Sequence, residues 1–600
     1  MPTFNPRIGR VRALAAVMAS AVWLAPAANA QVKAPASTVQ NSTLDARLFH
    51  QLLIGEIELR EGDLSAAYQL MLDAARRTSD EQLFRRATDI ALQGRAGDEA
   101  LVAVKAWRQA LPGSPEAMRY QIQLLVQLNR TGDTVEPLQA LLKITPSVQR
   151  AALIGALPRL LARSSDHILA ANVMEQALLP YIDDPDTRVA ARVTIGRGWL
   201  AAINGTKALA LAQSAHEMDR SAEGPAGLAL EMLPGTPAAE AIVQDHLAAK
   251  PDSNGVRLLY VRALLAGQRL ADATAQLETL THNAPQLPQA WLTLGALHVQ
   301  LREPAPAIAA LTKYIELVQA APDASADADG ASASADDDTP TGSKEDALTR
   351  GWLLLSQAAD LQGDFKGAEA WLAKIDSPQR ALEVQARRAS LLAREGKVAQ
   401  ARELIRKLPE KNPEDARAKL LAEAQVLRDA KLWADANTLL AQANQRFPND
   451  VDLIYEQSMM AEKLNKLADM ERLLRRVIEL KPDHQHAYNA LGYSLAERNV
   501  RLTEARSLIQ KALELSPGEP SITDSMGWVE YRLGHRDEAI RLLRDAYRSQ
   551  PDAEIAAHLG EVLWVDGQVD EARRILREAR ARDAGNDVLR ETLARLRVDL

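Results

Sequence analysis

The chain has 600 residues and a formal net charge of −8, and 47% of its residues are hydrophobic while only 4% are aromatic. It contains no cysteine, which excludes disulfides, thiolate catalysis and cysteine-based metal sites. An acidic chain without a basic patch lacks the electrostatic footprint of a nucleic-acid-binding protein, so we expect no nucleic-acid partner.

The first 30 residues have the layout of a secretory signal peptide. Three arginines precede the apolar run "ALAAVMASAVWLA", and Ala28 and Ala30 form a small-residue cleavage site. This run is shorter than the roughly 20 residues that a membrane-spanning helix needs, and no other run approaches that length. We therefore predict cleavage after Ala30, an exported chain in the periplasm with no transmembrane segment, and a short leader at 31–47. Association with the outer membrane stays open, but the absence of cysteine excludes a lipid anchor on that residue.

Residues 48–320 are interpreted as an array of imperfect helix pairs. The first pair contains Gly55, Gly62 and Ala67, and further pairs are predicted to begin near residues 81, 115, 150, 188, 220 and 254. The clearest unit contains Trp291, Leu294 and Gly295. Because residues 150–186 fit the pattern least, a hidden active site in this region is one alternative function.

Residues 321–347 form an acidic segment. The stretch 321–346 holds eight acidic residues and one lysine, with few apolar side chains. Such a composition cannot build a packed core, so we expect this segment to be disordered. It either separates two arrays as a hinge or loops out between two stacked units, and the sequence favours neither.

Residues 348–586 carry the most regular pattern, followed by a predicted capping helix at 587–600. Gly492 and Gly527 are 35 residues apart, while Ala505 and Ala539, like Pro517 and Pro551, are 34 apart. A small residue inside a helix lets a neighbouring helix approach closely, and a proline ends the second helix of a pair. The recurring residues are Gly492, Ala505, Ala512, Pro517, Gly527, Ala539, Ala546, Pro551, Gly560, Ala572 and Ala579.

This period of 34 residues with L-G, A, A and P at fixed offsets is similar to that of the tetratricopeptide repeat (TPR) family. The resemblance implies an all-α fold, an α-solenoid of about 15 helix–turn–helix units in two arrays separated by the acidic segment. It also implies a concave surface, lined by the first helix of each unit, that binds other proteins.

No motif for catalysis, phosphate binding or metal binding is found, since H-E-x-x-H, G-x-S-x-G and the phosphate loop are all absent. We therefore expect a non-enzymatic protein without cofactor or metal. On the TPR resemblance, the predicted binding groove uses an aromatic strip with polar neighbours, a composition typical of interface hot spots. Its residues are Asn489, Tyr493, Asp524, Trp528, Tyr531, Arg532, His558, Glu561 and Trp564. The alternative is that Trp528 and Trp564 simply pack between adjacent helices.

The C-terminal block also resembles the large TPR proteins of the proteobacterial periplasm and outer membrane. These include an adaptor that partners a carboxy-terminal processing protease and brings it cell-wall hydrolases. The resemblance implies an adaptor whose partners are a protease and its substrates. That adaptor is a lipoprotein, and the missing cysteine means that lipid attachment is not carried over. The alternative is a structural scaffold for envelope or exopolysaccharide assembly and export.

Overall fold

The computed structural model describes residues 45–233, 235–322, 343–376 and 380–598. These residues form 31 α-helices and three short 3-10 helices, without a β-strand. The predicted all-α class is thereby confirmed. Among the described helices, none combines the length and apolarity that crossing a bilayer requires. The predicted signal peptide, the leader up to residue 44 and most of the acidic segment lie outside the described residues.

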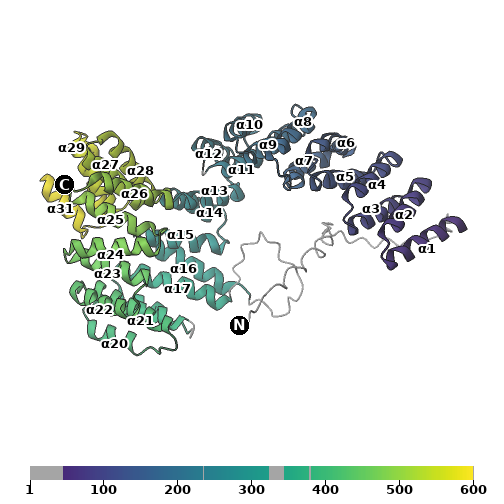
Figure 1. Cartoon of the computed structure of the whole chain (residues 1–600). Helices are drawn as coiled ribbons and strands as arrows, with labels where there is room; N and C mark the ends of the chain where they lie inside the picture. Colours follow the sequence, from purple (N-terminus) through teal and green to yellow (C-terminus); the bar gives the residue numbers. More distant parts are fainter. Residues whose placement is uncertain (1–44, 234, 323–342, 377–379, 599–600) are drawn as a thin grey trace. The chain divides into compact units, whose positions relative to one another are not determined.

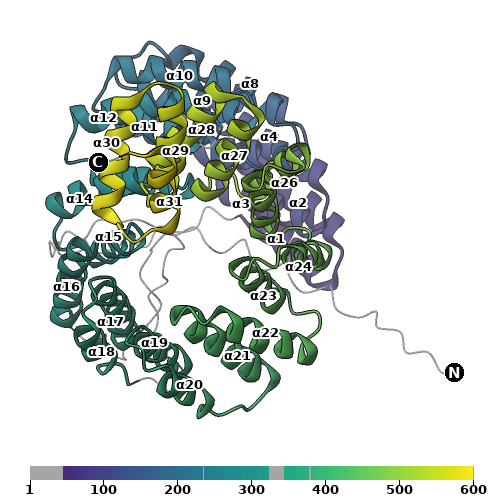
Figure 2. The same cartoon turned by 90° about the vertical axis from the view of Figure 1, so that its left-hand side faces the viewer.

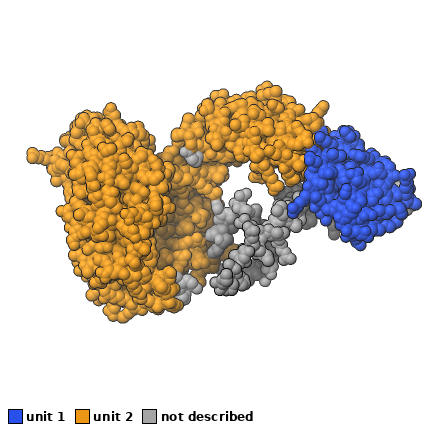
Figure 3. Space-filling view, viewed as in Figure 1, with its two compact units in different colours: residues 1–112 blue, residues 113–600 orange. Residues whose placement is uncertain are grey.

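Two compact units divide the chain, residues 1–112 and residues 113–600 (Figure 3). In unit 1, the side chain of Asp45 caps the first helix by accepting a hydrogen bond from the Leu48 N–H. That helix ends at Gly62, whose φ of 92° lies in the left-handed region that glycine adopts without strain. The helices of unit 1 are α1 (Ala46–Glu61), α2 (Leu64–Thr78), α3 (Glu81–Gln93) and α4 (Gly97–Ala110) (Figure 1).

Unit 2 contains the remaining helices. Its first part comprises α5 (Pro115–Gln127), α6 (Val135–Ile144), α7 (Ser147–Leu161), α8 (His167–Leu178), α9 (Arg188–Ala201), α10 (Gly205–Met218), α11 (Glu223–Met232), α12 (Glu240–Ala249), α13 (Asn254–Ala266), α14 (Leu270–Asn283), α15 (Pro288–Gln300) and α16 (Pro304–Ala320). The 3-10 helices are η1 (Thr131–Thr134), η2 (Leu179–Tyr181) and η3 (Pro237–Ala239). Helices α7 and α8 and the 3-10 helix η2 occupy most of residues 150–186, and α7 and α8 pack mainly on α9 rather than on each other.

The second part of unit 2 continues the series. It comprises α17 (Lys344–Leu361), α18 (Phe365–Leu372), α19 (Ala381–Arg394), α20 (Val398–Arg406), α21 (Pro413–Asp429), α22 (Trp433–Arg446), α23 (Val451–Lys463), α24 (Leu467–Leu480), α25 (Gln485–Glu497), α26 (Leu502–Leu515), α27 (Pro520–Leu533), α28 (Arg536–Ser549), α29 (Ala553–Val565), α30 (Val569–Arg582) and α31 (Asp587–Leu596). Consecutive helices pair along the described chain, so α1 to α30 make 15 pairs and α31 follows alone, as the repeat count predicted.

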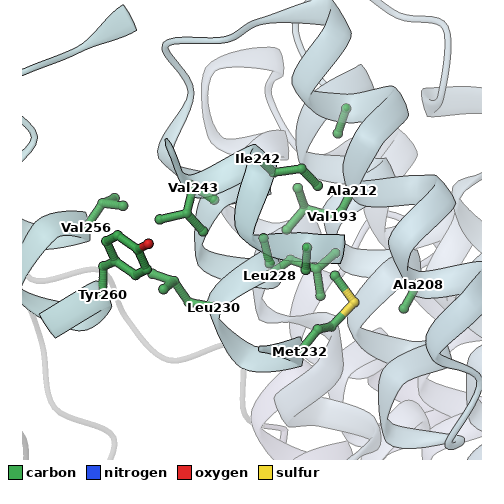
Figure 4. Packing of buried hydrophobic residues seen from close by; sticks show 14 of the residues in the cluster. Val193, Ala208, Ala212, Leu228, Leu230, Met232, Ile242, Val243, Val256 and Tyr260 are labelled. Carbon is green, nitrogen blue, oxygen red and sulfur yellow. The ribbon is translucent and has the colours of Figure 1, made fainter. Parts of the chain in front are cut away.

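The hydrophobic core of unit 2 runs from pair to pair. Its largest cluster extends from Met118 in α5 to Ala310 in α16. Figure 4 shows one section, where Val193, Leu228 and Ile242 from three different helices lie close together. A core that is shared by neighbouring pairs is what stabilises a repeat array, because one pair alone cannot bury its apolar face.

Three glycines of the repeat pattern lie where two helices approach most closely. A Cβ added at Gly492 would lie 2.6 Å from Cγ1 of Ile509 and 2.9 Å from the carbonyl oxygen of Ala505. At Gly527 the nearest atom would be Cγ of Leu543, at 2.7 Å. At Gly560 an added Cβ would come within 2.6 Å of Leu576. These helix pairs therefore have no room for a side chain at the glycine.

The helices on either side of the acidic segment pack directly on each other. α16 contacts α17, and the Tyr314 hydroxyl donates a hydrogen bond to the Ala347 carbonyl oxygen at 3.0 Å. The stacking of pairs thus continues past the segment. Among the described helices, α16 and α17 on either side of the segment therefore stack as neighbouring pairs.

The array of unit 2 bends until distant pairs meet. α14 contacts α28, and Nη1 of Arg302 lies 3.5 Å from Oδ2 of Asp583. Figure 2 shows the curved run between them, in which α15, α17, α19 and α21 lie on the inner side. The first helix of each of these pairs therefore faces the interior of the curve.

Candidate protein-binding groove

The predicted aromatic strip of the C-terminal repeats lies on α25, α27 and α29, but much of it is buried. The Trp528 side chain is only 1% exposed, and its ring stacks on the His558 imidazole with ring centres 4.5 Å apart. Its Nε1 donates a hydrogen bond to Oε2 of Glu497 at 2.7 Å. These contacts match the packing alternative for Trp528, and this ring offers no surface to a partner.

His558 is the centre of a buried polar cluster. Its Nδ1 lies 2.8 Å from Oδ2 of Asp524, and its Nε2 lies 3.2 Å from the Tyr493 hydroxyl. Burial lowers the pKa of His558, but the charge and hydrogen bond of Asp524 outweigh it and raise that pKa above its usual value. The cluster therefore favours a charged imidazolium paired with a carboxylate.

This cluster predicts that the C-terminal repeats lose stability as the pH rises. A histidine whose pKa is raised by folding makes its full contribution to folding stability at pH values below its pKa in the unfolded state, about 6.5. That contribution disappears as the pH rises through the raised pKa. Glu554, whose pKa is raised by burial, faces the same cluster and acts in the same direction. Hydrogen exchange of the α27 amides from pH 6.5 to about 9, compared at equal intrinsic exchange rates, measures the effect.

The variant His558→Gln serves as the control for this pH dependence. It keeps a polar side chain near Asp524 but cannot carry the charge, so its stability should change less across the same pH range. If stability changed equally with pH in both proteins, the pH dependence would arise from a group other than His558.

The other strip residues are also engaged within the chain. Nη2 of Arg532 donates a hydrogen bond to the Glu497 carbonyl oxygen at 3.1 Å, and Glu561 pairs with Arg595 of α31. Trp564 is half-buried, and the guanidinium of Arg573 lies 5.6 Å from the centre of one of its rings. Asn489 and Tyr531 are half-buried as well. Since the large side chains fill the inner face of these repeats, binding at this strip stays a prediction for its half-buried members alone.

A groove of about 850 Å³ lies instead on the inner side of α15, α17, α19 and α21. Four consecutive pairs supply it, each through its first helix. It is lined by Gln289, Leu292, Thr293, Ala296, Arg350, Leu353, Leu354, Gln357, Asp360, Arg380, Glu383, Ala386, Arg387, Ser390, Arg394, Gln425 and Asp429. The groove thus lies on the inner face formed by the first helices, where the repeat architecture predicts partner binding. It lies nearer the middle of the chain than the predicted strip on α25, α27 and α29.

Side-chain size explains why the groove is open here. In each first helix a small buried residue packs against the paired helix, and the next residue points inward. That next residue is Ala296, Gln357, Ser390 or Gln425 around the groove, but Tyr493 or Trp528 in the strip. The rings of Tyr493 and Trp528 both pack against His558, whereas the shorter side chains around the groove leave a volume that a partner can fill.

The acidic groups of the groove are already paired within the chain. Nη1 of Arg394 donates to Oδ2 of Asp360 at 2.5 Å, and Arg380 lies 3.3 Å from Glu383. Burial raises the pKa of the Asp360 carboxyl, an effect that Arg394 opposes. Oδ1 of Asp360 is buried without a hydrogen-bond partner among the described residues. Asp429 accepts hydrogen bonds from Ser390 and Gln425.

Nothing in the described part of the chain suggests a metal centre, because no three His, Asp or Glu side chains gather closely enough to hold an ion. Sequence reasoning missed the groove residues because it concentrated on the repeats with the clearest pattern. The same inward positions in the repeats after Trp291 identify Gln357, Ser390 and Gln425 directly. The signal was a side chain without an aromatic ring at each of these inward positions.

Comparisons with known proteins agree with this architecture. The family model described as "Tetratricopeptide repeat" matches residues 258–325, 455–520 and 525–587. A TPR repeat-containing protein of Pseudomonas aeruginosa is 38% identical over 242 residues, which is 40% of this chain and 41% of that protein. The human tetratricopeptide repeat protein 7A is 38% identical over 96 residues, 16% of this chain and 11% of that protein. The matches thus span less than half the length of these relatives.

Among solved structures, a thermophilic TPR protein of Thermus thermophilus aligns with a TM-score of 0.28 and 22% identity, over 30% of this chain and 98% of that chain. The hetero-tetramer Cut9–Hcn1 of the APC/C aligns with a TM-score of 0.27 and 14% identity, over 92% of this chain and 96% of that chain. Stacked helix pairs around an inner groove define the class of helical-repeat interaction scaffolds. Within that class, the family-model match identifies residues 258–325, 455–520 and 525–587 as tetratricopeptide repeats, and the similar stretch of the Pseudomonas aeruginosa protein belongs to a TPR repeat-containing protein.

Proposed function

We propose that the chain is a non-enzymatic scaffold that holds an extended segment of another protein in the groove formed by α15, α17, α19 and α21. The observation that carries the proposal is the groove itself, about 850 Å³ lined by the inner faces of four consecutive pairs. Its volume falls within the range of sites that enclose small ligands or short peptide segments.

The lining has the mixture of groups that a polypeptide requires. Leu292, Leu353 and Leu354 offer apolar surface for side chains. The side-chain amides of Gln289 and Gln357 make no hydrogen bond within the described chain, and Oδ1 of Asp360 also lacks a partner there. Free donors and a free acceptor together complement a peptide backbone, which has one N–H and one C=O at almost every residue.

Site-specific photo-crosslinking in the source cells tests this proposal. A benzophenone amino acid placed at Thr293 or Ala386 in the groove should crosslink to a partner protein. The same group at Thr438, an exposed position on the second helix of a pair, provides the control. Crosslinks that are equal at the groove and at Thr438, or absent from the groove, would contradict the proposal.

We further propose that the scaffold acts in the periplasm as an adaptor that delivers cell-wall hydrolases to a processing protease. The support is the signal-peptide layout of residues 1–30 and the resemblance of the C-terminal block described above. Export requires the mature chain to begin at Gln31, which N-terminal sequencing determines. Recovery of a processing protease and hydrolases by the groove crosslinker supports delivery, whereas recovery of envelope or polysaccharide export components supports the alternative scaffold role.

A further inference from the structure

Two arginines of the groove form no ion pair or hydrogen bond in the described part of the chain. Arg350 on α17 and Arg387 on α19 both line the groove and are half-buried. Neither forms an ion pair or a hydrogen bond with another described residue, and Nε of Arg350 is buried without an acceptor. Buried polar groups are nearly always paired, so a buried unpaired guanidinium nitrogen requires an explanation.

The acids of the groove form no ion pair or hydrogen bond with either arginine, although Asp360 lies near enough for the charge of Arg387 to act on it. Asp360 is held by Arg394, Glu383 by Arg380, and Asp429 by Ser390 and Gln425. The two free guanidinium groups lie on neighbouring inner helices of the same groove. They therefore present positive charge and N–H donors to whatever occupies it.

We infer that the groove selects partner segments that carry acidic side chains, with Arg350 and Arg387 each binding one carboxylate. Guanidinium groups match carboxylates with two parallel N–H···O bonds, and such charge-assisted bonds are stronger than neutral ones. This inference rests on the proposed function and specifies the chemistry of the partner.

An acidic peptide fits the lining better than a nucleic acid. Three leucines border the arginines and accommodate apolar side chains, while Asp360, Glu383 and Asp429 would repel a continuous phosphate backbone. The chain as a whole is also acidic, with a net charge of −8. The partner segment is therefore one that interleaves acidic with apolar residues.

Selection of random dodecapeptides displayed on phage against the full chain tests the inference. The selected peptides should be enriched in Asp and Glu, and their dissociation constants are then measured by fluorescence anisotropy. Each of Arg350→Gln and Arg387→Gln should weaken binding about tenfold, at the lower end expected for a partly exposed charge-assisted bond. Replacing the matching acid of the peptide by its amide should weaken binding as much, and the two changes together should not add.

The matched control is the pair Arg119→Gln and Arg577→Gln, which removes two exposed arginines outside the groove. It should leave binding unchanged. Leu353→Asp separates the two levels of the proposal, provided that circular dichroism shows all variants equally helical. If peptide binding were weakened by Leu353→Asp but not by Arg350→Gln or Arg387→Gln, the proposed preference for acidic segments would be wrong, and binding in the groove would still be supported. Peptides that depend on none of the three would overturn the groove as well.

Discussion

Trp528→Ala is expected to lower the free energy of unfolding of the C-terminal repeats by about 3–5 kcal/mol. The indole is 1% exposed, stacks on His558 and donates a hydrogen bond to Glu497, so its removal leaves a cavity and an unpaired carboxylate. Hydrogen exchange of the amides in α27 and α29 measures this loss locally, without requiring that the whole array unfold at once.

Trp564→Ala is the matched control, since this indole lies in the next pair and is only half-buried. Its removal should cost about 1 kcal/mol, typical of a partly exposed site. If Trp528→Ala instead left stability unchanged and weakened binding of a partner, the ring would be part of a binding surface, as the sequence first suggested.

Gly492→Ala is the second large effect that we expect, a net destabilisation of up to about 2 kcal/mol. Alanine raises helix propensity by about 1 kcal/mol over glycine, but overpacking costs about 1–3 kcal/mol. At Gly492 the new Cβ would meet a backbone atom, the Ala505 carbonyl oxygen at 2.9 Å, so α25 and α26 would have to separate. Urea denaturation of the full chain measures the change in the C-terminal transition.

Gly155→Ala tests the opposite case. Gly155 lies inside α7, and an added Cβ would have no atom within 4 Å apart from its own helix, so only the gain in propensity remains. This variant should be about 0.5–1 kcal/mol more stable. A Gly492→Ala protein as stable as Gly155→Ala would show that close packing does not determine the glycine positions.

The arrangement of helices could be predicted because its causes are local. The recurrence of small residues such as Gly527 and Ala539 sets which helix faces which, and caps such as Asp45 and Gly62 set where helices begin and end. Even in the imperfect repeats, α3, α5, α9 and α13 begin at the predicted residues 81, 115, 188 and 254.

The position of the groove could not be predicted in this way, because it depends on which side chains of neighbouring helix pairs come into contact in the folded chain. Trp528 is an aromatic residue at an inward position, which is equally compatible with a hot spot and with core packing. What decides between them is the presence of Tyr493 and His558 on the adjacent helices. The same holds for the arginines of the groove. Arg394 forms a hydrogen bond with Asp360 and Arg350 does not, and this difference depends on which helix carries Asp360 and on how deeply Asp360 is buried.

The most direct measurement is an electron cryo-microscopy structure of the full chain bound to the partner recovered by groove crosslinking. It should show an extended segment along the inner faces of α15, α17, α19 and α21, with acidic side chains against Arg350 and Arg387. A partner seated on α25, α27 and α29, with the groove between α15 and α21 empty, would contradict the account.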